Sequence, residues 1–119
     1  MKVLDLIDKY YPQDNELKHI LNVHSRSVAD KALWIAGKHP ELNLDTVFLE
    51  EAAMLHDIGI FLTHAPGIQC FGTEPYICHG YLGAGLVRKE GFPRHVAGKY
   101  GRTSDLLCRQ VFFENPSRP

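Results

Sequence analysis

Apolar residues recur at three- and four-residue intervals over much of the chain, which is the spacing that one face of an α-helix requires. Leu4, Ile7 and Tyr11 predict a short first helix, which Pro12 ends because its ring blocks a further helical turn. Strand-like alternation of apolar and polar residues is scarce. The pattern therefore predicts an all-α protein, a compact bundle of about five to six helices.

A second, longer helix is predicted to begin after Asp14 or Asn15, either of which can cap it, and to end near residue 38. Pro40 follows and disfavours further helix. The apolar stripe of this helix comprises Leu17, Ile20, Leu21, Val28, Ala32 and Ile35. His24 falls on the same stripe, so we expect its imidazole to point into the core.

A third helix is predicted to start at a cap formed by Asp45 and to run toward the pair His56-Asp57. Its apolar positions include Val47, Phe48, Ala52 and Leu55. Gly59 follows at the point where a helix end favours a residue with positive φ. His56 and Asp57 are therefore expected in the last turn of this helix.

The remainder of the chain carries a weaker pattern. Residues 63–76 contain two prolines and two glycines and are predicted to form a loop, and helical spacing returns over about residues 79–90. Farther on, Pro93 is predicted to start a short helix and Ser104 to cap a last one. No repeat or linker interrupts the chain, so residues 1–119 are expected to form a single domain.

Charge narrows the range of partners. The chain has 13 basic and 14 acidic residues, a formal net charge of −1, and no run of Lys and Arg. It therefore offers no basic track for a nucleic-acid polymer or an anionic membrane. A small phosphorylated ligand is compatible with this charge, because a bound metal ion can supply positive charge locally.

Cysteine usage and the N-terminus bear on location. The three cysteines, Cys70, Cys78 and Cys108, lack Cys-x-x-Cys spacing, and we expect three free thiols in a reducing compartment. Asp5 and Asp8 lie early in the chain, which is unlike a signal peptide. No apolar run approaches the ~18 residues that cross a bilayer. The expected location is the cytoplasm.

Three histidines stand in apolar or glycine-rich surroundings, where an unpaired imidazole would cost free energy: His24, His56 and His79. Hydrogen bonds to the backbone or a metal ion would satisfy them. Asp57 favours the metal, since a carboxylate at a helix C-terminus faces the negative end of the helix dipole and a cation would offset that repulsion. His56 and Asp57 are the expected ligands, and His24 from the preceding helix is the third.

These residues resemble the HD-domain phosphohydrolases. The matching segments are 23–29, which contains His24, and 52–59, which ends in His56-Asp57-Ile58-Gly59. Cys78-His79-Gly80 resembles the His-Gly step of one subgroup, the bacterial symmetrical dinucleoside-tetraphosphate hydrolases and their relatives. The resemblance covers about residues 14–96 and leaves residues 97–119 as a divergent tail.

The resemblance implies one or two divalent transition-metal ions, of Fe, Mn, Co, Ni or Zn, as the cofactor. It implies His24, His56 and Asp57 as metal ligands, His79 as a further ligand for a second ion, and Asp57 as the catalytic, metal-bridging carboxylate. The implied activity is hydrolysis of a phosphoester or phosphoanhydride in a small, nucleotide-like substrate by a metal-activated water.

The chain also departs from the family pattern, which normally closes with a late Asp. Asp105 and His95 are the candidates to complete the ligand set, although the sequence around each matches the family pattern poorly. Loss of that ligand motivates an alternative, a non-catalytic HD-like module that binds a nucleotide or a protein. A plain helical scaffold is a third interpretation.

Other side chains have less specific interpretations. Arg26 could contact a phosphate or be a solvated helix arginine, and His64 could serve as a ligand or proton donor. Phe112 and Phe113 could pack in the core or form an interface, so a homodimer is a possible assembly.

Overall fold

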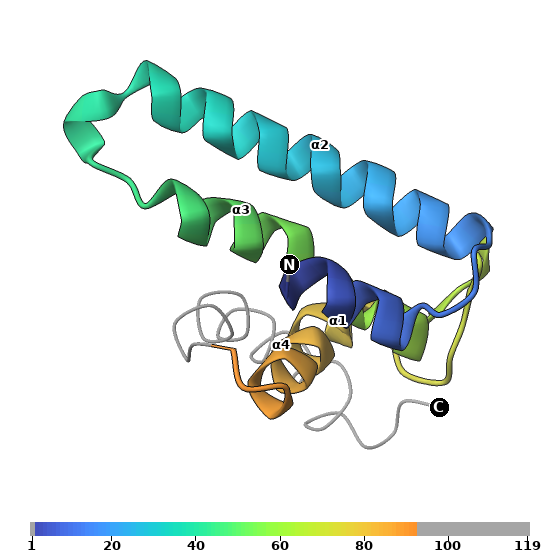
Figure 1. Ribbon diagram of the computed structural model, residues 1–119. Helices are drawn as coiled ribbons and strands as arrows, with labels where there is room; N and C mark the ends of the chain where they lie inside the picture. Colours follow the sequence, from blue (N-terminus) through green and yellow to red (C-terminus); the bar gives the residue numbers. More distant parts are fainter. Residues whose placement is uncertain (1, 93–119) are drawn as a thin grey trace. The chain divides into compact units, whose positions relative to one another are not determined.

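A computed structural model describes residues 2–92, which form four α-helices, two short strands and four short 3₁₀ helices (Figure 1). The all-α class is therefore confirmed. The helices predicted at Pro93 and Ser104 lie outside the described residues, as does the tail 97–119. The chain divides into two compact units, Met1–His56 and Asp57–Pro119. A single domain over residues 1–119 stays a prediction.

The first unit contains α1 (Lys2–Tyr10), α2 (Glu16–Lys38), the 3₁₀ helix η1 (Pro40–Leu42) and α3 (Thr46–Leu55). The predicted caps form at two of the helix starts. The side chain of Asn15 accepts a hydrogen bond from the backbone N–H of Lys18, and that of Asp45 accepts one from the backbone N–H of Phe48. Each cap satisfies a backbone donor that has no partner inside its helix, which fixes where α2 and α3 begin.

Helices α2 and α3 run antiparallel and side by side (Figure 1). Five of the eight buried residues of the two helices are small. The eight are Leu21, Ser25, Ala29 and Ala36 on α2, and Ala52, Ala53, Met54 and Leu55 on α3. Small residues such as Ser25 and Ala29 let a neighbouring backbone approach closely.

The predicted orientation of α2 was wrong. His24 is exposed and Ile35 is 41% exposed, whereas the neighbouring Ser25 is fully buried. The buried face includes the predicted Leu21 and continues in four-residue steps to Ser25 and Ala29, which lie one position after the predicted His24 and Val28. The hydrophobic pattern did not predict this buried face, because serine counts as a polar residue although its small volume lets it pack in the interior.

The second unit, as far as it is described, packs the 3₁₀ helix η2 (Ile58–Leu62) against α4 (His79–Lys89). Gly59 makes this approach possible, since a Cβ there would lie 2.6 Å from the backbone nitrogen of Gly83 and closer still to the carbonyl oxygen of His79. The expected positive φ at Gly59 was wrong. Among the described glycines, Gly91 has a positive φ, 83°, just after α4.

The predicted loop is a closed hairpin. Strands β1 (His64–Ala65) and β2 (Cys70–Phe71) pair antiparallel, with the 3₁₀ helix η3 (Pro66–Ile68) between them. The base of the hairpin is joined by backbone hydrogen bonds from Gly72 N–H to Thr63, at 2.9 Å, and from His64 N–H to Glu74, at 2.9 Å. Thr63 is fully buried, and its hydroxyl donates to the carbonyl of Ile60 at 2.7 Å.

Beyond the hairpin, η4 (Tyr76–Cys78) leads directly into α4. Cys70 is a buried free thiol, but Cys78 is disulfide-bonded, so the expectation of three free thiols was wrong for Cys78. Across residues 2–92, none of the helices has both the length and the apolar character needed to span a membrane.

Candidate metal centre

His24 and His56 face each other from the two paired helices of the first unit. His24 lies on α2, and His56 caps the C-terminus of α3 with helical backbone angles (φ −62°, ψ −28°). Their ring centroids are 5.2 Å apart, and the rings are tilted by 50°. The predicted convergence of these two imidazoles is therefore present, although His24 reaches it from an exposed position.

The backbone fixes the orientation of the His56 ring. Its Nδ1 lies 2.5 Å from the carbonyl oxygen of Ala53, one helical turn earlier. Because a carbonyl oxygen can only accept, Nδ1 must carry the proton of this hydrogen bond. In the neutral ring Nε2 then holds the lone pair, which is the arrangement that histidine ligands of metal ions adopt.

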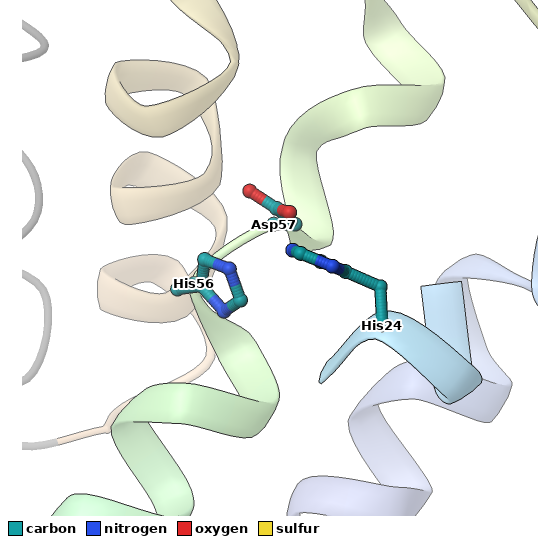
Figure 2. A group of neighbouring side chains, drawn as sticks. All are labelled: His24, His56 and Asp57. Carbon is teal, nitrogen blue, oxygen red and sulfur yellow. The ribbon is translucent and has the colours of Figure 1, made fainter. Parts of the chain in front are cut away.

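Asp57 is placed beside His56 by the peptide bond that joins them. Its side chain is 15% exposed, and it stands at the start of η2 without a capping hydrogen bond from its own side chain. One potential ligand atom from each of His24, His56 and Asp57 lies within 4.8 Å of the other two (Figure 2). The three expected ligands therefore form one group.

His79 approaches the same carboxylate from within the second unit. Its Nε2 lies 3.2 Å from Oδ1 of Asp57, and its Nδ1 lies 2.6 Å from the carbonyl oxygen of Tyr76. Nδ1 must donate to that carbonyl, so Nε2 can face the carboxylate only across a proton or a cation. His79 therefore contacts the carboxylate of Asp57, but it does not belong to the group formed by His24, His56 and Asp57.

The donor set fits a divalent transition metal. Two imidazole nitrogens and a carboxylate oxygen suit Fe, Mn, Co, Ni and Zn. Ligand atoms about 2.0–2.2 Å from one ion are at most ~4.4 Å apart, and the atoms of this group, all within 4.8 Å of one another, are close to that spacing. Three protein ligands also leave open positions for water or substrate, as catalytic metal sites require.

The family model described as HD domain matches residues 22–115, which is more than half of the chain. The chain belongs to the HD-domain family. No curated protein matches the chain, and no solved structure does.

HD domains form a superfamily of metal-dependent phosphohydrolases and bind divalent metal ions, so the cofactor class agrees with the donor group of this HD domain. The match does not reach the finer level of the symmetrical dinucleoside-tetraphosphate hydrolases, and that subgroup stays a prediction. The match also runs past residue 96, where the motif resemblance ended.

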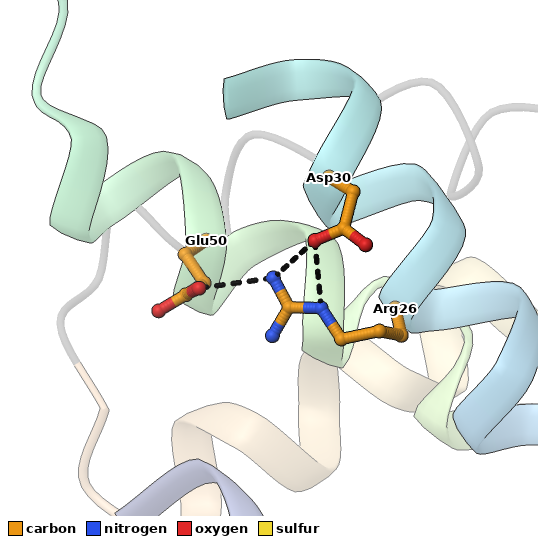
Figure 3. A network of polar contacts seen from close by, with 3 residues as sticks. All are labelled: Arg26, Asp30 and Glu50. Carbon is orange, nitrogen blue, oxygen red and sulfur yellow. Dashed lines mark hydrogen bonds and ion pairs between the residues drawn. The ribbon is translucent and has the colours of Figure 1, made fainter. Parts of the chain in front are cut away.

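Arg26 contacts carboxylates on both helices of the pair (Figure 3). Its Nε donates to Asp30 at 3.0 Å, and its Nη2 donates to Glu50 of α3 at 2.9 Å. The hydrogen bond to Glu50 is the main cause that raises the pKa of Arg26. The guanidinium therefore joins α2 to α3, and a contact with phosphate would have to compete with two carboxylates.

The remaining candidates lie apart from the group of three or beyond the described part of the chain. His64 is exposed on β1 and faces Phe71 across the hairpin. Asp105 and His95, proposed to complete the ligand set, lie outside the described residues, as do Phe112 and Phe113.

Two features of the site carried no recognisable signal in the sequence. The backbone carbonyl of Ala53 orients the His56 ring. Every residue has such a carbonyl, so the residue type at position 53 does not reveal this hydrogen bond. Tyr76 stacks on His79, and burial together with the charge of Asp57 raises the pKa of its hydroxyl. Tyr76 lies in a segment predicted as a loop, so nothing in the sequence predicted its contact with His79 or its proximity to Asp57.

Proposed function

We propose that this HD domain hydrolyses a phosphoester or phosphoanhydride of a small, nucleotide-like substrate at a divalent ion held by His24, His56 and Asp57. The observation that carries the proposal is the group of three ligand atoms within 4.8 Å. The hydrogen bond from His56 to Ala53 supports it, because the bond leaves Nε2 as the coordinating atom.

The residues of the group divide the work. Asp57 supplies the anionic oxygen, and we propose it as the catalytic carboxylate that ion and water share. His56 supplies a nitrogen of fixed orientation, and the exposed His24 supplies a nitrogen on the open side. When bound, the ion would neutralise phosphate charge and lower the pKa of a water. We propose that His79 holds a proton at Nε2 beside Asp57 or takes a second ion.

The substrate is proposed to be small. The chain carries a net charge of −1 and no basic run, so attraction of the substrate depends on the local ion instead of an extended positive surface. Nucleic-acid polymers and anionic membranes are therefore not expected as partners. A cytoplasmic location and a possible homodimer remain predictions of the same kind.

The test combines elemental analysis with a phosphate-release screen. Purified protein should hold Fe, Mn, Co, Ni or Zn, and should release phosphate from nucleotides when one of these ions is supplied. His56→Ala and Asp57→Asn should lower both metal content and turnover, whereas His19→Ala, an exposed histidine of the same helix as His24, should change neither. Wild-type protein that takes up no metal and releases no phosphate would contradict the proposal.

A non-catalytic binding module is the second candidate. The group of three contains a single carboxylate, and a further anionic ligand has not been located in residues 2–92. This candidate predicts that a nucleotide raises the melting temperature of the metal-loaded protein without phosphate release. Turnover above that of the Asp57→Asn variant would exclude it.

A further inference from the structure

Tyr76 presents an aromatic ring next to the proposed site. Tyr76 is 43% exposed as a residue, and its ring centroid lies 4.5 Å from that of His79, with a tilt of 32° between the planes. His79 in turn places Nε2 3.2 Å from the carboxylate of Asp57. Two contacts within one unit therefore connect an exposed aromatic surface to the carboxylate proposed to hold the ion.

The backbone around Tyr76 is well fixed. The carbonyl of Tyr76 accepts the hydrogen bond from Nδ1 of His79, and the N–H of Cys78 donates to Pro75 at 3.0 Å. Just before this turn, the N–H of Glu74 donates to Leu62 at 3.1 Å, which secures the end of the hairpin. A ring held by a fixed backbone and by one stacking neighbour loses little conformational entropy when a second flat group stacks on it.

Part of the Tyr76 side chain is accessible to a ligand. Single exposed aromatic residues are ordinary on protein surfaces, so it is the fixed position of Tyr76 beside His79, and not its exposure alone, that points to a ligand. Because His79 contacts both Asp57 and Tyr76, a single imidazole ring separates the carboxylate of the proposed site from this surface. The chemistry that fits there is a flat aromatic group, as in a nucleobase.

We propose that Tyr76 is a specificity-determining residue whose exposed ring stacks against the aromatic base of the substrate, so that the site prefers nucleoside phosphates to aliphatic phosphates. The inference rests on the proposed function and extends it to the class of leaving group or substituent. It assigns to Tyr76 a role in recognition, separate from coordination and from the reaction at phosphorus.

The experiment compares two probes that share a phosphate and differ in the base. Isothermal titration calorimetry of the Mn-loaded full chain measures Kd for adenosine 5′-monophosphate and for ribose 5-phosphate, and steady-state kinetics measures KM and kcat for both. The variants are Tyr76→Leu, which removes the ring, and Tyr76→Phe, which keeps it. Phe71→Leu is the matched control, since Phe71 is an aromatic residue of the hairpin that is 69% exposed.

The wild-type protein should bind adenosine 5′-monophosphate about tenfold to a hundredfold more tightly than ribose 5-phosphate, which is the range that stacking on one base spans. Tyr76→Leu should reduce this ratio at least tenfold, with the change in KM larger than that in kcat. Tyr76→Phe and Phe71→Leu should keep the ratio.

Other results overturn the inference. An unchanged ratio in a folded Tyr76→Leu variant, or equal binding of the two probes to the wild type, shows that Tyr76 does not read the base. A change in kcat without a change in the ratio assigns Tyr76 to the positioning of His79. If Tyr76→Leu does not fold, two other measurements test the inference. One is the ratio of the two Kd values for the wild-type protein, and the other is a crystal structure of Tyr76→Phe with adenosine 5′-monophosphate, which shows whether the base stacks on the ring.

Failure of the proposed function gives a different pattern. In that case the wild-type protein takes up no metal and binds neither probe, and the inference falls with it. Hydrolysis of ribose 5-phosphate at least as efficient as that of adenosine 5′-monophosphate would instead leave the function in place and remove only the role of Tyr76.

Discussion

His56 and His79 are oriented by the same local device, a hydrogen bond from Nδ1 to the carbonyl oxygen three residues earlier in the chain. Each bond uses a carbonyl of the residue's own turn, so the ring is directed without help from a distant side chain. This explains how a short chain can hold two imidazoles in a defined tautomer. In both rings Nε2 is the nitrogen that does not bond to this carbonyl, and in His79 it faces the carboxylate of Asp57.

Gly59 provides a residue-scale prediction. Gly59→Ala places a Cβ against the backbone of His79 and Gly83, so η2 and α4 must separate, at a cost of about 1–3 kcal/mol in the free energy of unfolding. Gly85→Ala is the matched control in α4, because nothing lies within 4 Å of its added Cβ. That variant should gain up to ~1 kcal/mol from helix propensity. Urea denaturation of both variants checks the pair, and equal stabilities would refute the close approach at Gly59.

Cys70 gives a prediction on pH. Burial raises the pKa of its thiol, so the folded protein keeps the proton at a pH where the unfolded chain has lost it. The folded state then binds more protons than the unfolded state, and stability falls as pH rises past the ordinary thiol range. Between pH 7 and pH 10, wild-type protein should lose more stability in urea denaturation than Cys70→Ala does. Parallel losses in the two proteins would show that the thiol titrates normally.

At the scale of the elements, the ends of helices were easier to predict from the sequence than their faces. Asn15 and Asp45 are capping residues by chemistry, and each accepts the expected hydrogen bond. The buried face of α2 was missed by one position because Ser25 is chosen for its size. Residues 63–76 were correctly taken as irregular, but the two-residue strands within them are too short for an alternating pattern to reveal.

The ion pair between Arg26 of α2 and Glu50 of α3 should contribute little to the free energy of unfolding. Both side chains are partly exposed, so water and salt screen the pair, and a double-mutant cycle with Arg26→Gln and Glu50→Gln should give a coupling of about 0.2–1 kcal/mol. The coupling should shrink in 1 M NaCl, where the Debye length is ~3 Å. Thermal or urea unfolding measures it. A coupling that is insensitive to salt would mean that packing, and not charge, joins the two side chains.

For the whole molecule, the sequence predicted which side chains lie close together better than it predicted their surroundings. Potential ligand atoms of His24, His56 and Asp57 lie within 4.8 Å of one another, and Nε2 of His79 lies 3.2 Å from Asp57. Their role as metal ligands stays a prediction. The exposure of His24 and the stacking of Tyr76 depend on helix phase and on loop closure, which local patterns do not encode. The candidates Asp105 and His95 lie outside the described residues, so completion of the ligand set stays a prediction.

Metal binding should stabilise the entire fold. An ion that binds the native state and not the unfolded chain adds ~2.7 kcal/mol at 100 times its Kd, which corresponds to roughly 10 °C in Tm. Addition of Mn to EDTA-treated protein should raise Tm by this amount in calorimetry, and the shift should be lost in His24→Ala. His19→Ala should retain it. A shift of equal size in His24→Ala would place the ion elsewhere.

The buried hydroxyl of Thr63 and the backbone bonds beside it separate the tip of the hairpin from its base. Pro66, Gly67 and Gln69 at the tip are exposed, so residues can be inserted or deleted there without pulling on the turn that carries Tyr76. The length of this tip can therefore change while the turn that leads into α4, and the histidine at the start of that helix, stay in place.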